Sequence, residues 1–207
     1  MGAKQAVRRR LDVEARRAEL LQLGMELFAT RAYDEVAIEE IAERAGISRG
    51  LLYHYFPTKR DFYLAVTGTA VDEISRLTRP RTDLAAMDNV AAGLDAYLAY
   101  AETHAHGFLT AHRGALAGDA EVRAVVQRSR EGQVGRLLAV LAGGRRPTPL
   151  ARLAVQGWIT LVQDATVRWL EQRRPSRARL AAWLLQTLEC MWAAAAKTEP
   201  RRRPARR

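Results

Sequence analysis

Apolar residues recur every three or four positions along almost the whole chain, and this spacing limits its fold more than any other feature. The period places apolar side chains on one face of a helix, where they can pack against other helices. No segment shows the alternation of apolar and polar residues between turns that is typical of a strand. At 207 residues the chain is long enough for one or two domains. The sequence therefore predicts an all-α protein of about nine helices.

Glycine, proline and hydroxyl residues mark the ends of these helices. Gly46 can take the left-handed conformation that ends a helix, and Ser48 can cap the next one. Pro57 ends that short helix, and Thr58 can cap the helix after it. The expected helices span residues 13–30, about nine residues ending before Gly46, a short stretch between Ser48 and Pro57, and residues 59–77, 83–104, 106–117, 119–142, 149–173 and 177–197.

Composition excludes several classes of protein. No window reaches the ~20 apolar residues of a membrane span, and no apolar leader follows the N-terminus, so a cytoplasmic protein is expected. One cysteine cannot form an internal disulfide or a multi-thiolate zinc site. His104, His106 and His112 lack partners at metal-ligand spacing, so no metal or cofactor is expected. No nucleophile elbow, phosphate-binding glycine loop or paired-carboxylate site is present, which argues against an enzyme.

The net charge of +10 is concentrated in the second half of the chain. Residues 1–60 carry 11 basic against 9 acidic residues, whereas residues 123–196 carry 12 against 4. The last residues, 199–207, contain five arginines and two prolines and are expected to form a disordered basic tail. The total charge is therefore weak evidence for nucleic-acid binding, and the case depends on motifs.

Residues 36–60, VAIEEIAERAGISRGLLYHYFPTKR, have the spacing of a helix-turn-helix. A helix of about nine residues is followed by a turn at Gly46 and a second short helix. Leu52 and Phe56 lie four positions apart and are expected to face the core. The outward face of the second helix would then carry Arg49, Gly50, Leu51, Tyr53 and His54, at the end that enters a major groove.

The pattern around this motif resembles the TetR family of transcriptional repressors over about 45 residues. The matching residues are Leu27-Phe28, Tyr33, Val36, Ile41-Ala42, Ala45-Gly46-Ile47-Ser48, Leu52-Tyr53, Tyr55-Phe56 and Lys59. The rest of the chain resembles the family only as an all-α segment of suitable length. The resemblance implies a DNA-binding domain at residues 1–57, an effector-binding and dimerisation domain at 58–198, and the tail at 199–207.

The resemblance also assigns roles in DNA binding. Arg49 stands at the base-reading position, where its guanidinium can bridge O6 and N7 of a guanine. Gly50 permits close approach of the backbone, and Leu51 offers an apolar contact to a thymine methyl group. Phosphate contacts are expected from Ser48, Tyr53, His54 and Lys59, and further affinity from a flexible arm that includes Arg10 and Arg16. Three departures limit the match, because Leu51 stands where the family often has Thr, Ala or Ser, Ala37 lacks a capping hydroxyl, and Glu39 would repel DNA.

The later helices are expected to supply a dimer interface and a ligand pocket. A repressor with one short recognition helix per chain needs a homodimer to specify a site, and the expected interface includes Leu153, Gly157, Leu161, Leu184, Leu188 and Met191. Polar and aromatic residues at core-like positions suggest a pocket for a small molecule. These residues are Tyr97, Tyr100, His104, Phe108, Arg113, Trp158, Gln163 and Trp169.

Two functions follow as alternatives. The first is a repressor that a small hydrophobic effector releases from a pseudo-palindromic operator. The basic region 123–179 and the segment 108–136 loosely resemble regulators of lipid metabolism. This resemblance suggests a fatty acid or acyl-CoA as the effector. The second is a helical architectural or partner-binding protein that associates with DNA without an effector. Sequence-independent affinity and no response to ligands would mark the second.

Overall fold

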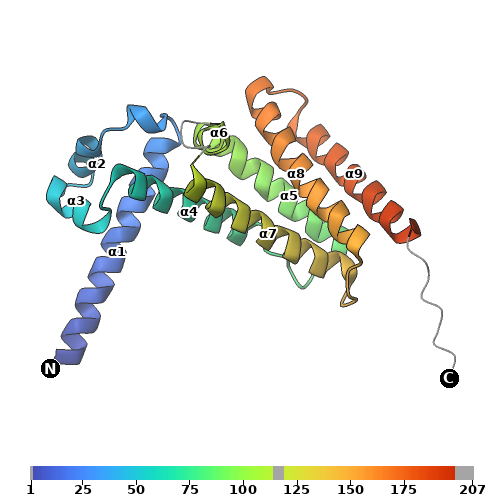
Figure 1. The fold of residues 1–207 in the computed structure, drawn as a ribbon, viewed down its shortest axis with the longest axis horizontal. Helices are drawn as coiled ribbons and strands as arrows, with labels where there is room; N and C mark the ends of the chain where they lie inside the picture. The colour runs from blue at the N-terminus through green and yellow to red at the C-terminus, as the bar shows by residue number, and fades with distance from the viewer. Residues whose placement is uncertain (1, 114–118, 199–207) are drawn as a thin grey trace. The chain divides into compact units, whose positions relative to one another are not determined.

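The computed structural model describes the backbone of residues 2–113 and 119–198, and the side chains of residues 13–112 and 119–197. This described part contains nine α-helices, a short 3-10 helix at Tyr33–Glu35 and no strand (Figure 1). The all-α prediction is therefore confirmed. The helices are α1 (Gly2–Phe28), α2 (Ile38–Arg44), α3 (Arg49–Tyr55), α4 (Lys59–Leu77), α5 (Ala86–Thr103), α6 (Ala105–Arg113), α7 (Ala120–Ala142), α8 (Pro149–Gln172) and α9 (Arg177–Thr198).

Most helices lie where the sequence places them, and two begin elsewhere. Helix α1 begins at Gly2, so the backbone around Arg10 is helical and does not form the flexible arm that was expected. Alanine and arginine are good helix formers and explain this extension. Helix α5 begins three residues later than expected because Asn89 ties down the preceding loop: its amide donates to the carbonyl oxygens of Arg81 and Leu84, and its oxygen accepts from the Arg81 N–H.

The chain divides into two compact units. The first contains residues 1–73 and 104–127, and the second contains residues 74–103 and 128–207. Helix α6 belongs to the first unit because Gly107 lies against the end of α1: a Cβ atom at this position would be 3.0 Å from the Phe28 carbonyl oxygen. The functional boundary expected after residue 57 stays a prediction.

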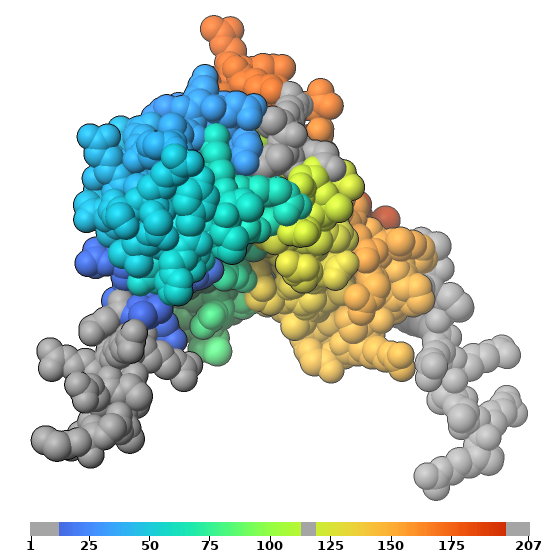
Figure 2. All heavy atoms as spheres, turned by 60° about the vertical axis from the view of Figure 1, so that its left-hand side comes forward, coloured from blue at the N-terminus to red at the C-terminus, as the bar shows by residue number. Residues whose placement is uncertain are grey.

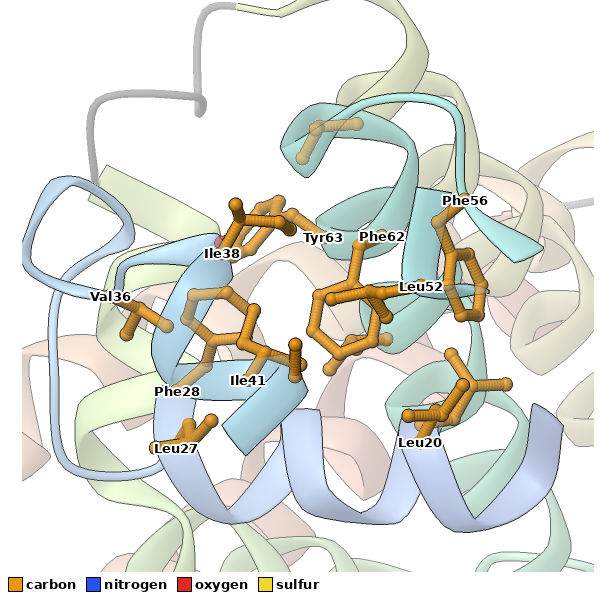
Figure 3. Packing of buried hydrophobic residues seen from close by; sticks show 14 residues of the cluster. Leu20, Leu27, Phe28, Val36, Ile38, Ile41, Leu52, Phe56, Phe62 and Tyr63 are labelled. Atoms are coloured by element: carbon orange, nitrogen blue, oxygen red, sulfur yellow. The ribbon is translucent and has the colours of Figure 1, made fainter. Parts of the chain in front are cut away.

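An aromatic core holds the first unit together (Figure 3). Phe62 of α4 packs with Phe56 at a centroid distance of 5.0 Å, and Tyr63 meets Phe28 of α1 at the same distance. Leu52 of α3 is fully buried in this cluster. Helices α1 and α4 approach so closely at Gly24 that a Cβ atom there would lie 2.6 Å from the Phe62 ring.

Helices α5, α8 and α9 form the core of the second unit and lie side by side (Figure 1). Leu98, Leu184 and Leu188 are fully buried between them. The indole N–H of Trp158 in α8 donates to the Leu184 carbonyl oxygen of α9 at 2.7 Å. This bond fixes the relative register of the two helices and satisfies a buried donor. No helix in the described part of the chain is long and apolar enough to cross a membrane.

Candidate functional site

The turn between α2 and α3 is built from the residues that the sequence singled out. Gly46 has a φ of 64°, in the left-handed region that favours glycine. The Ser48 hydroxyl accepts the Leu51 N–H at 3.2 Å and so caps α3. Leu52 and Phe56 are buried on the inner side of α3. These contacts fix the helix by its inner face and leave the opposite face open.

The outer face of α3 carries the expected DNA-contacting residues. Arg49, Gly50, Leu51 and His54 are exposed, and Tyr53 is partly buried. Leu51 is 40% exposed, so its side chain is available for an apolar contact. In the space-filling view, the residues of α3 lie at the surface of the first unit (Figure 2, cyan).

The guanidinium of Arg49 is held between two side chains. Its Nη1 lies 2.8 Å from the Glu39 carboxylate of α2, and its Nη2 donates to the Tyr53 hydroxyl at 3.4 Å. The guanidinium carbon also lies 5.4 Å from the centre of the Tyr53 ring. The hydrogen bond to Tyr53 and the Glu39 charge both raise the pKa of Arg49. Glu39, expected only to repel DNA, thus orients a cation on the recognition helix in this structure.

Other expected phosphate-binding residues lie in defined places. Lys59, the first residue of α4, has its Nζ 4.4 Å from the centre of the Tyr33 ring. Arg16 on α1 is exposed and pairs with Glu19 at 2.7 Å. The Arg10 side chain lies outside the described residues.

Sequence reasoning missed Arg17, an exposed residue of α1 whose guanidinium carbon lies 5.2 Å from the centre of the Phe56 ring. This contact places a cation beside the end of α3. A single sequence gives no signal for it, because the contact depends on how α1 crosses the helix-turn-helix.

The second unit contains a cavity with about 80 Å³ of space for water-sized groups, and it opens to solvent. Helices α5, α7 and α8 supply most of its wall. The lining residues are Thr78, Pro80, Asn89, Val90, Gly93, Leu94, Tyr97, Gln133, Arg136, Leu137, Val140, Trp158, Ile159, Val162 and Gln163.

Only part of the expected ligand set lines this cavity: Tyr97, Trp158 and Gln163 do so. Tyr100 and Trp169 are buried elsewhere in the second unit, and the Trp169 indole N–H donates to the Pro175 carbonyl oxygen at 2.8 Å. Neither residue lines this cavity, and a role for them in ligand binding stays a prediction.

Three further residues of the expected ligand set lie away from the cavity or outside the described part. His104 and Phe108 belong to the first unit, where Phe108 stacks on His112 at a centroid distance of 4.3 Å. Neither lines this cavity, so their expected role in ligand binding stays a prediction. The Arg113 side chain lies outside the described residues.

The expected dimer face needs a similar correction. Leu184 and Leu188 are fully buried within the chain, so neither can contact a partner in this conformation. They face α8 and α5 because α9 is apolar on more than one side. Leu153, by contrast, is 62% exposed, Gly157 is exposed, and Leu161 and Met191 are partly exposed. Trp183 on α9 is 50% exposed and was not among the interface residues expected from the sequence.

Comparison with known families decides between the possible classes. The family model described as "Bacterial regulatory proteins, tetR family" matches residues 20–66, which include the helix-turn-helix. A second model, "Tetracyclin repressor-like, C-terminal domain", matches residues 87–191, about half of the chain. This chain belongs to the TetR family. TetR-family proteins are DNA-binding transcriptional regulators and not enzymes.

The names of two curated relatives describe opposite effects on transcription, one activation and the other repression. The transcriptional activator FasR of Mycolicibacterium smegmatis is 28% identical over 172 residues, which cover 80% of this chain and 77% of FasR. The transcriptional repressor KstR2 of the same organism is 37% identical over 79 residues, which cover 31% of this chain and 38% of KstR2. Membership of the TetR family therefore leaves the sign of regulation open.

Solved structures match the TetR-family fold across most of the chain. A TetR-family transcriptional regulator from Streptomyces coelicolor is 32% identical, with a TM-score of 0.82 over 90% of this chain and 84% of its own. The regulator FadR from Bacillus subtilis, in complex with stearoyl-CoA, has a TM-score of 0.64 at 17% identity and covers 83% of this chain and 96% of its own. At that identity, the FadR structure supports the fold alone.

Proposed function

We propose that this TetR-family regulator is a repressor that binds a pseudo-palindromic operator as a homodimer and leaves it when a small hydrophobic effector enters the cavity. The proposal rests above all on the exposed face of α3, where Arg49 is held by Glu39 and Tyr53. These contacts place the Arg49 guanidinium on the outward face of α3, at the end that would enter the major groove. Such a regulator would act on DNA in the cytoplasm.

Specificity and affinity come from different residues in this proposal. Arg49 reads one base pair in each half-site, worth roughly 1–3 kcal/mol of discrimination, and Leu51 contacts a thymine methyl group. Ser48, Tyr53, His54 and Lys59 contact phosphates and fix the position of α3 in the groove. Arg10 and Arg16 add sequence-independent affinity. Arg17 joins this second group, because its contact with Phe56 keeps it beside α3.

The homodimer would form through the outward faces of α8 and α9. Leu153 of α8 and Trp183 of α9 are large, exposed apolar side chains on two helices that pack together, and a partner subunit would cover them. Gly157 and Met191 join the two helices, since a Cβ atom at Gly157 would lie 3.4 Å from the Met191 methyl group. A two-fold dimer would present two recognition helices and so require a palindromic site.

The effector would occupy the cavity of the second unit. Its walls are mostly aliphatic and aromatic, with a few polar groups, as is typical of sites for small organic ligands. A fatty acid or acyl-CoA is the first candidate to test, and FadR from Bacillus subtilis, which shares the fold, was crystallised with stearoyl-CoA.

Selection of operators from a random duplex library, followed by transcription in vitro from a promoter that overlaps the selected site, tests this function. We expect enrichment of a pseudo-palindrome and a fall in transcript as the protein is added. Failure to enrich any sequence would favour an architectural DNA-associated protein. An increase in transcript would make the protein an activator, as FasR is named.

A further inference from the structure

A guanidinium group lies in the wall of the cavity with one nitrogen that has no hydrogen-bond partner among the described residues. Arg136 of α7 lines the cavity, and its Nη2 is buried with no hydrogen-bond partner among the described residues. Other arginines of the chain reach carboxylates: Arg60 pairs with Asp119 at 2.8 Å, and Arg168 pairs with Asp164 at 2.7 Å. Arg136 is partly buried, and a buried guanidinium nitrogen that lacks a partner is costly to keep.

The surroundings of Arg136 increase this imbalance. Burial and the nearby charge of Arg79 both lower the pKa of Arg136, so its environment disfavours a second positive charge. Among the described residues that line the cavity there is no carboxylate. The site therefore has an excess of positive charge that an incoming anion would neutralise.

The backbone of α7 makes room for this guanidinium. A Cβ atom at Gly132 would lie 3.3 Å from Nη1 of Arg136, so the arginine side chain lies along its own helix over a residue that has no side chain. This arrangement keeps the charged group at the cavity wall while the long stem stays beside α7.

The remaining wall is apolar or neutral. Leu94, Val140 and Val162 are typical of its aliphatic surface. Asn89 offers little to a ligand, because its amide group is already bound to the loop before α5. Gln133 and Gln163 are neutral. A ligand that matches this wall has one anionic group and an apolar body.

We propose that Arg136 binds the anionic headgroup of the effector, which is an amphipathic acid whose apolar body fills the rest of the cavity. This inference rests on the proposed function, because it assigns a ligand class to the effector site. A carboxylate can accept two parallel hydrogen bonds from a guanidinium, and a phosphate monoester offers the same oxygen chemistry. The headgroup enters as the anion and Arg136 stays protonated, so no proton is transferred.

The test compares three probes that share one alkyl chain: decanoate, decyl phosphate and 1-decanol. Their binding to the full-length, DNA-free protein is measured by calorimetry below their critical micelle concentrations. We expect at least one of the two anions to bind about 10- to 100-fold more tightly than decanol, the advantage of a charge-assisted hydrogen bond. The anion that binds more tightly distinguishes a carboxylate effector from a phosphorylated one.

Variants of α7 assign this preference to one residue. Arg136→Gln should reduce the affinity for the preferred anion to that of decanol and leave decanol binding unchanged, whereas Arg136→Lys should retain part of the preference. Arg128→Gln removes an exposed charge from the same helix and should leave all three affinities unchanged. Without ligand, Arg136→Gln should unfold at a higher temperature than the wild-type protein, because it removes a partly buried charge whose Nη2 has no hydrogen-bond partner among the described residues.

Several outcomes would overturn the proposal: equal binding of anions and decanol, no binding of any probe to the wild-type protein, an unchanged preference in Arg136→Gln, or a lower unfolding temperature of that variant without ligand. Failure of the proposed function is measured separately, as release of the operator. If decanoate binds through Arg136 and the operator stays bound, the headgroup assignment stands and the effector mechanism fails.

Discussion

Arg60, at the start of α4, donates two hydrogen bonds of 2.8 Å to the carboxylate of Asp119, 59 residues further along the chain. The same carboxylate accepts the N–H groups of Glu121 and Val122 and thereby caps α7. Arg60 is the main cause that holds the pKa of Asp119 at about 2, well below its usual range. One side chain therefore joins the beginnings of two helices of the first unit.

This pair predicts a pH-dependent stability. Because the pKa of Asp119 is lower in the folded state than its unfolded value of about 3.9, its contribution is complete above that value and is lost as the pH falls towards 2. Asp119→Asn should lower the unfolding temperature at pH 7, and the difference from wild type should shrink below pH ~4. Asp83→Asn is the control, since Asp83 pairs with Arg81 on an open surface and should matter little. An effect of Asp119→Asn that is independent of pH would contradict this account.

Gly24 predicts a steric effect at the contact of α1 and α4. Gly24→Ala should destabilise the protein by about 1–3 kcal/mol, because the added methyl group would overlap Val66 and Phe62. Gly68→Ala is the matched control: no atom lies within 4 Å of a Cβ built there, and the gain in helix propensity should stabilise the protein by about 0.8–1 kcal/mol. Denaturant titration measures both. Equal effects of the two substitutions would show that α1 and α4 are not closely packed at Gly24.

The recognition helix predicts a separation of specificity from affinity. Arg49→Ala should remove discrimination at one base pair in each half-site, whereas Lys59→Ala should weaken binding to all sequences and lower the salt slope by about one unit. Glu39→Gln should partly reduce discrimination at that base pair, because it removes one of the two side chains that contact the Arg49 guanidinium. Anisotropy titrations of operator and random duplex across a salt series measure these effects. If Arg49→Ala weakens both duplexes equally, Arg49 does not read a base.

The exposed surface of α8 and α9 predicts the oligomeric state. Leu153→Glu should convert a dimer to monomers that lose operator binding, because it would bury an unpaired carboxylate in the interface. Arg152→Glu, at the neighbouring exposed position, is a control for the added negative charge. Sedimentation measures the association, and Cys190, which is exposed on α9, can be labelled with a maleimide to report whether that helix is covered. A Leu153→Glu variant that remains dimeric would place the interface elsewhere.

The helix-turn-helix was predictable from sequence because local rules fix it. Thr58 caps α4 by accepting the Asp61 N–H at 3.0 Å, and this helix spans the predicted residues, Lys59–Leu77. Gly46 and Ser48 likewise act within a few residues of their own positions. In such cases the residue and its contact are close in sequence, so the pattern contains the information.

The cavity and the dimer face were less predictable because they depend on how distant helices pack. An arginine in a helix such as α7 is usually expected at the surface. Nothing near Arg136 in the sequence shows that this residue lines a cavity. Leu184 and Trp183 are neighbours in an apolar helix, yet one is fully buried and the other is half exposed. The hydrophobic period of α9 cannot select between its two apolar faces without the positions of α5 and α8.

Reciprocal titration tests most directly whether an occupant of the cavity weakens DNA binding. Operator affinity is measured with and without saturating decanoate or decanoyl-CoA, and the affinity for the same ligand is measured with and without operator. We predict that ligand lowers operator affinity roughly 5- to 150-fold and that operator lowers ligand affinity by the same factor. Gly93→Leu, which adds a side chain at the cavity wall, should abolish the response and retain DNA binding. A ligand that saturates the cavity and leaves operator affinity unchanged would contradict the account.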